Sequence, residues 1–182
     1  MCGFFISFNS DQSSISRRIK DILGTRGSDH VTELCVGAWH IIFSRLEICG
    51  DGPSYQQPVW TPTGHSFTVL NGQIYNYKHL KDIYSLPDYF NDTQVCHWLI
   101  ENYGFDVALT KFNGMFAIAN VNTKTQNICF ATDVYSQKPL YFFEDNSRIL
   151  MASNINCIKE ILKPRACEDA ARIYLSSDET VG

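Results

Sequence analysis

Apolar and polar positions follow strand-like and helix-like periods in turn along the 182-residue chain. Residues 2–8 are almost continuously apolar and predict a strand that begins almost at the first residue, although chain ends fray unless contacts hold them. Apolar residues at helical spacing over 15–23 predict a helix that Gly24 ends. Residues 31–44, rich in β-branched and aromatic side chains, fit two strands.

The second half of the chain is richer in strand signals than in helix signals. Residues 66–70 predict a strand that runs into Asn71-Gly72, and helices are expected over 76–84, capped by Asn76, and over 93–103. Further strands are expected over residues 114–121, 126–133, 140–144 and 148–153. Because these strands follow one another as hairpins and the helices are segregated from them, the pattern predicts an antiparallel α+β fold.

The amino-acid composition indicates a globular protein and argues against nucleic-acid and membrane binding. The chain is 45% apolar and carries 15 Lys and Arg against 19 Asp and Glu, for a net charge of −4, which suits one globular domain. Without a cluster of basic residues, a nucleic-acid surface and a membrane patch are not expected. We find no signal peptide or membrane span in the sequence, and therefore expect a cytoplasmic protein.

The cysteines do not form a recognisable framework. There are seven, an odd number, without a CxxC pair or a histidine at ligand spacing. Neither a disulfide framework nor a metal site is expected, and the internal cysteines are predicted to be small buried side chains.

Cys2 is the residue with the clearest chemical meaning. Removal of Met1 would leave a thiol and a free α-amine on one residue. Since an α-amine has a reference pKa near ~8, it can accept the thiol proton and so act as the base for a nucleophile. The competing interpretation is an inert cysteine that stands at position 2 by chance.

Asn71-Gly72 allows two interpretations. Asn-Gly is a common tight-turn dipeptide and needs no function to explain it. Alternatively, the amide of Asn71 and the backbone N–H of Gly72 form an oxyanion hole, where hydrogen-bond donors stabilise developing negative charge.

Two charged residues suggest a site for a zwitterion. Arg45 offers a guanidinium to an α-carboxylate, and Asp92 offers a carboxylate to an α-ammonium. Taken singly, Arg45 fits a charged residue at a solvated strand end, and Asp92 fits an ordinary helix N-cap. A Cys/His dyad is a further arrangement, but spacing singles out none of the histidines, which are His30, His40, His65, His79 and His97.

Short motifs in a fixed order cover nearly the whole chain. They are Met1-Cys2-Gly3, Arg26-Gly27-Ser28-Asp29, Ser44-Arg45-Leu46-Glu47-Ile48, Asn71-Gly72-Gln73-Ile74-Tyr75-Asn76, Asn91-Asp92-Thr93, Asn113-Gly114-Met115-Phe116-Ala117, and Asp133 followed by Gln137-Lys138-Pro139-Leu140-Tyr141. With these motifs the sequence resembles the glutaminase domain of glutamine-dependent asparagine synthetases, a class II glutamine amidotransferase of the N-terminal-nucleophile hydrolase superfamily.

The resemblance implies a fold and a set of roles. The fold would be a four-layer αββα sandwich of two antiparallel sheets. Cys2 would attack L-glutamine to give a γ-glutamyl thioester and ammonia, with Asn71 and Gly72 as the oxyanion hole. The substrate-binding residues implied are Arg45 for the α-carboxylate, Asp92 for the α-amine, and Leu46, Ile48 and Gln73.

The sequence departs from the family pattern at several positions. Gln73 stands where these synthetases usually have a glutamate that helps to hold the substrate α-amine, and Thr25 and Ser28 replace the usual His and Pro. The Ser-Gly-Gly-x-Asp-Ser loop of the ATP-binding synthetase domain has no counterpart in the chain. We therefore expect no cofactor here, with ATP and Mg used only by a synthetase domain or subunit.

These observations give one expected function and two alternatives. The expectation is a glutaminase domain over residues 1–167, with 168–182 as a helix leading toward a linker, which supplies ammonia to a synthetase partner and could form a homodimer. One alternative is a catalytically degenerate module that docks on such a partner. The other is an N-terminal-nucleophile amidase acting on another amide, for which Arg45 and Asp92 would be unexplained.

Overall fold

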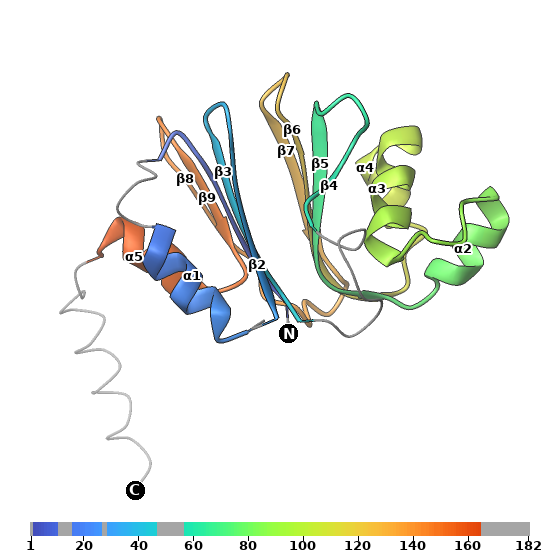
Figure 1. The fold of residues 1–182 in the computed structure, drawn as a ribbon, viewed down its shortest axis with the longest axis horizontal. Coiled ribbons are helices and arrows are strands. Elements are labelled where there is room, and N and C mark those ends of the chain that lie inside the picture. Colours follow the sequence, from blue (N-terminus) through green and yellow to red (C-terminus); the bar gives the residue numbers. More distant parts are fainter. Residues whose placement is uncertain (1, 11–15, 27–28, 47–56, 165–182) are drawn as a thin grey trace, which may run out of the picture.

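Two antiparallel sheets stacked face to face, with helices on both outer faces, make up the fold (Figure 1). The structure is a computed structural model, and it describes residues 2–10, 16–26, 29–46 and 57–164. The two sheets and the helices on their outer faces confirm the four-layer α+β arrangement that the resemblance implied.

The first sheet has five strands in the order β2-β3-β1-β9-β8. Its helices, α1 and α5, cover the outer face (Figure 1). The bounds of these elements are β1 Gly3–Phe8, α1 Ser16–Gly24, β2 His30–Val36, β3 Trp39–Arg45, β8 Tyr141–Glu144, β9 Ile149–Ala152 and α5 Ile155–Leu162.

The second sheet has four strands in the order β4-β5-β6-β7. The remaining helices cover its outer face (Figure 1). The bounds are β4 Val59–Trp60, β5 Ser66–Ile74, α2 Tyr77–Tyr84, α3 Asp92–Tyr103, α4 Phe105–Leu109, β6 Gly114–Asn122 and β7 Asn127–Thr132.

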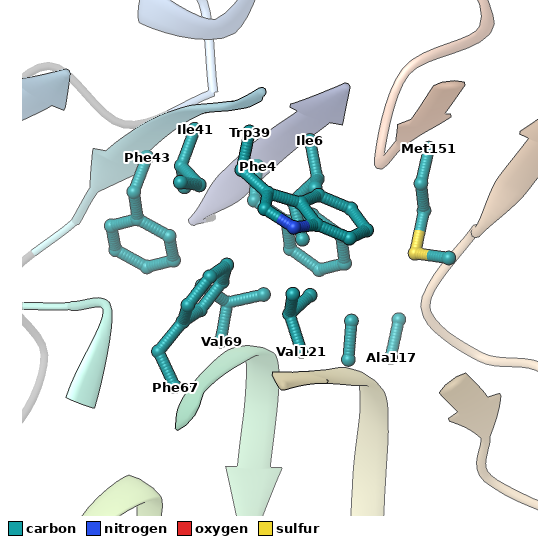
Figure 2. Close-up of a cluster of buried hydrophobic side chains, with 11 residues drawn as sticks. Phe4, Ile6, Trp39, Ile41, Phe43, Phe67, Val69, Ala117, Val121 and Met151 are labelled. Atoms are coloured by element: carbon teal, nitrogen blue, oxygen red, sulfur yellow. The ribbon is translucent and has the colours of Figure 1, made fainter. Parts of the chain in front are cut away.

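One hydrophobic core lies between the two sheets (Figure 2). Strand β1 supplies Phe4 and Ile6 to it, whereas Phe5, between them, points to the opposite face and packs against α1 and α5. Because side chains of a strand alternate between faces, a strand buried on both sides reads as a continuous apolar run. This explains the pattern of residues 2–8, and the pairing of β1 with β3 and β9 holds the start of the chain.

Several elements differ from the sequence prediction. The structure adds β4, α4 and α5, which the prediction lacked, and it extends β5 from residue 70 to Ile74. Asn76 occupies the N-cap position of α2 but makes no capping bond, since its Nδ2 donates to the carbonyl of Lys111 (2.9 Å) and its Oδ1 accepts from the N–H of Asn113 (3.0 Å). The helix predicted after residue 168 lies outside the described residues.

The internal cysteines follow the prediction only in part. Cys96 and Cys157 are buried as expected, but Cys35 and Cys129 are exposed, because they lie on the outer strands β2 and β7. All five cysteines of the described residues are free thiols. Among the helices of that part of the chain, none has the length and apolar character needed to cross a membrane.

Candidate active site

A pocket of about 110 Å³ lies where the start of β1, the end of β3, the last residues of β5 and the first turn of α3 meet. It brings together seven of the eight site residues that the sequence and the resemblance single out, which are Cys2, Arg45, Leu46, Asn71, Gly72, Gln73 and Asp92. The eighth, Ile48, lies outside the described residues. The pocket establishes proximity, and the roles of these residues remain predictions.

Strand pairing places the Cys2 thiol. Gly3 pairs with Ser44, so Cys2 lies one position further along, beside the end of β3. The Sγ of Cys2 accepts a hydrogen bond from the N–H of Leu46 (3.4 Å) and donates to its carbonyl oxygen (3.7 Å). These contacts hold the half-buried thiol at the pocket wall.

The side chain of Asn71 carries an unsatisfied donor. Asn71 is 1% exposed, and its Nδ2 has no hydrogen-bond partner among the described residues. A buried amide N–H without an acceptor costs about 1–3 kcal/mol, so such groups in folded proteins call for an explanation. Since this residue also lines the pocket, an oxygen atom bound there would supply the missing acceptor.

Asn71-Gly72 does not form the tight turn that its sequence also allowed. Both residues belong to β5 and pair with Ala117 and Phe116 of β6. Gly72 has a φ of +146°, and a Cβ atom built on it would lie 2.1 Å from the carbonyl oxygen of Met115. The glycine is therefore required by the close approach of the two strands.

We expect Gly72→Ala to lower the free energy of unfolding by about 3 kcal/mol, because the new methyl group meets rigid backbone and the φ is unfavourable for alanine. The matched control is Gly24→Ala at the end of α1, where a Cβ meets nothing within 4 Å. Urea unfolding of both variants measures the difference. Equal stabilities would show that β5 and β6 separate easily at this point.

Asp92 lies at the start of α3 and faces the end of β5. Its Oδ2 accepts the N–H of Ile74 (3.2 Å) and its Oδ1 accepts that of Thr93 (2.9 Å). Burial nevertheless raises the pKa of Asp92, because these bonds only partly offset desolvation. The helix N-cap is Asn91, which forms a capping box with Gln94, so capping does not account for Asp92.

Arg45 and Asp92 line the same pocket with opposite charges. Arg45 is only 7% exposed, at the end of β3. A ligand with an α-carboxylate and an α-ammonium group matches such a pair, and the cation of the ligand would favour the ionised form of Asp92. The pocket therefore suits a zwitterionic amino acid.

The sequence prediction missed further pocket residues, chiefly Gln57 and Lys138. The side chain of Gln57 exchanges two hydrogen bonds with the backbone of Leu70 (2.6 and 3.1 Å) and donates to the Oγ1 of Thr93 (3.1 Å), which ties β5 to α3 beside Asn71. Lys138 belongs to a motif of the resemblance, but nothing in the sequence indicated that it lies in the pocket. No cluster of metal-ligating side chains occurs within the described ranges.

Comparisons with known proteins identify relatives of the chain. The chain is 28% identical over 169 residues to asparagine synthetase (glutamine-hydrolyzing) 1 of Bacillus subtilis, an alignment that covers 84% of this chain and 26% of that protein. It is 26% identical over 154 residues to amidase chyE of Penicillium rubens, which covers 81% of this chain and 22% of the relative. The chain thus spans about a quarter of the length of these relatives.

The fold has a solved counterpart in glutamine phosphoribosylpyrophosphate amidotransferase from B. subtilis. The TM-score is 0.73 at 17% identity, over 88% of this chain and 43% of that one. The family model described as a glutamine amidotransferase domain matches residues 1–180. The chain belongs to this family of glutamine amidotransferase domains, and it is related to the glutaminase half of asparagine synthetases.

Proposed function

We propose that the chain hydrolyses L-glutamine to glutamate and ammonia through a thioester on Cys2. The observation that carries the proposal is the unpartnered Nδ2 of Asn71, in one pocket with the Cys2 thiol. A donor kept without an acceptor suits a site in which an oxyanion forms during the reaction. Arg45 and Asp92 add the charges that hold an α-amino acid.

The proposed reaction uses Cys2 for two tasks. After removal of Met1, the α-amine of Cys2 takes the thiol proton, and the sulfur attacks the carbonyl carbon, Cδ, of the glutamine side-chain amide. The oxygen of the tetrahedral intermediate accepts hydrogen bonds from the Asn71 amide and the Gly72 backbone. Collapse of the intermediate passes the proton to the leaving ammonia and leaves a thioester, which water then hydrolyses to glutamate with return of the thiol.

We further propose that the ammonia serves an amidation on a synthetase domain or subunit. The support is the relation to asparagine synthetases. ATP and Mg would bind to that partner and not to this chain. The amidase names among the relatives leave the acceptor of the ammonia open, and formation of a homodimer stays a prediction.

Labelling with diazo-oxo-norleucine, an electrophilic glutamine analogue, tests the proposal. We expect mass spectrometry to find the adduct on a peptide that begins with Cys2, and excess glutamine to prevent it. Ammonia release from glutamine by the same sample should be lost as labelling proceeds. Retained Met1 together with an unlabelled Cys2 would favour the docking module instead.

A further inference from the structure

The loop that connects β7 of one sheet to β8 of the other is anchored at its first residue, Asp133. Its carboxylate accepts hydrogen bonds from the backbone N–H groups of Phe116 (3.0 Å), Tyr135 (3.0 Å) and Gln137 (3.1 Å). Burial opposes ionisation of Asp133, but these bonds outweigh it and lower the pKa. Because Phe116 pairs with Gly72, the loop begins beside the proposed oxyanion hole.

The other end of the loop is anchored beside the start of β1. Tyr141 pairs with Ala152, which pairs in turn with Phe5. The next residue, Ser153, donates its N–H to the carbonyl of Phe4 (2.9 Å), and its Oγ accepts the N–H of Phe4 (3.1 Å). The loop therefore runs from the Gly72 side of the pocket to β8, which β9 joins to β1.

Lys138 lies between these two anchors. It lines the same pocket as Cys2 and is only 7% exposed, which is unusual for a lysine. In the order β3-β1-β9-β8, Arg45 belongs to the strand on one side of β1, and Lys138 precedes the outer strand on the other side. Two cationic side chains thus approach the pocket from opposite sides of Cys2.

In this arrangement the two cations would contact different ends of a bound amino acid. Arg45 and Asp92 account for the α-carboxylate and the α-ammonium of an amino acid. A substrate whose α end lies at Arg45 and Asp92 would have its γ-amide at Cys2, toward the side of the pocket that Lys138 lines. The charged side chains of the described pocket lining are Arg45, Lys138 and Asp92.

We propose that Lys138 acts on the γ end of the substrate, where it stabilises the developing oxyanion and retains the γ-carboxylate of the product. Glutamate carries one more negative charge than glutamine, so a lysine at the γ end of the ligand favours the product. The chain would then be inhibited by glutamate, and Lys138 would set the strength of the inhibition. The oxyanion part of the proposal rests on the proposed function, whereas the preference for glutamate over glutamine does not require turnover.

The test compares Lys138→Met and Lys138→Arg with Lys124→Met, a control on an exposed turn. For Lys138→Met we expect kcat to fall about 10-fold and the inhibition constant of glutamate to rise about 10-fold, since the cation proposed to act on the γ end is lost. The KM for glutamine should stay within about twofold. Lys138→Arg should keep kcat and the inhibition constant of glutamate close to the parent values, and Lys124→Met should change neither constant.

A binding experiment separates the two proposals. Calorimetric titration of Cys2→Ala, with and without Lys138→Met, gives the ratio of glutamate to glutamine affinity, which does not depend on the folded fraction of a variant. An unchanged ratio overturns the role of Lys138, as does a rise in KM at constant kcat, which would place Lys138 at the α-carboxylate. If Lys138→Met abolished the preference for glutamate while the parent chain released no ammonia from glutamine, the role of Lys138 in binding would be supported and the proposed function overturned.

Discussion

Replacement of Cys2 by alanine is expected to lower kcat for glutamine hydrolysis by at least about 10⁴-fold, because the variant loses the thiol that we propose as the nucleophile. Binding of glutamine should persist, since Arg45 and Asp92 remain in place. Ammonia release over a long incubation measures the residual rate, and calorimetry measures the binding.

The chain offers a matched control for this variant. Cys35 lies on the outer strand β2 and is exposed, so Cys35→Ala removes a thiol outside the pocket. We expect it to hydrolyse glutamine at the parent rate. If Cys2→Ala also kept the parent rate, a different residue would be the nucleophile and the proposed function would need another mechanism.

The second large effect is expected at Asn71. Asn71→Ala should lower kcat by about 10²–10³-fold, the usual cost of losing one oxyanion donor, and change KM little. The reason is that its Nδ2 has no partner in the structure and would gain one only as the oxyanion forms. Steady-state kinetics with glutamine measures both constants.

Asn120→Ala provides the comparison for Asn71→Ala. Asn120, on β6 of the same sheet, donates hydrogen bonds to Ser66 (3.2 Å) and Thr68 (3.1 Å) and does not line the pocket. Its loss should reduce stability by about 1–2 kcal/mol without lowering kcat per folded molecule. Equal loss of kcat in both variants would mean that the sheet, rather than the oxyanion hole, limits the reaction.

The strand and helix patterns predicted much of the fold. The apolar run of residues 2–8 and the hairpins of the second half became β1 and the strands β6 to β9. Helix α5 was not predicted, although Ile155, Ile158 and Leu162 have helical spacing. Helix α4 is only 5 residues long, which is too short for a period to emerge.

Local sequence was least informative at Asn71-Gly72. The same dipeptide suits a tight turn and a strand that approaches its neighbour closely, since both require a glycine. What decides between them is the pairing with β6, whose own Gly114 lies opposite Ile74. That pairing joins residues about 40 positions apart, beyond the reach of a local pattern.

Some residues of the candidate site could be predicted from the sequence and others could not. Cys2, Arg45 and Asp92 carry chemistry that their residue types suggest, and the ordered motifs linked them. Gln57 and Lys138 could not be found in this manner, because their places in the pocket depend on how other segments are tied together. For Lys138 the decisive contacts are those of Asp133 with β6 and of Ser153 with β1.

The position of β1 has a practical consequence for handling the protein. Its first residue pairs with β3, and the residue before it lines the pocket. An affinity tag fused ahead of Cys2 would convert the α-amine into an amide and place a polypeptide at the pocket. Recombinant material for every experiment above should therefore carry its tag at the other terminus, or be released by a protease whose cut leaves Cys2 as the first residue.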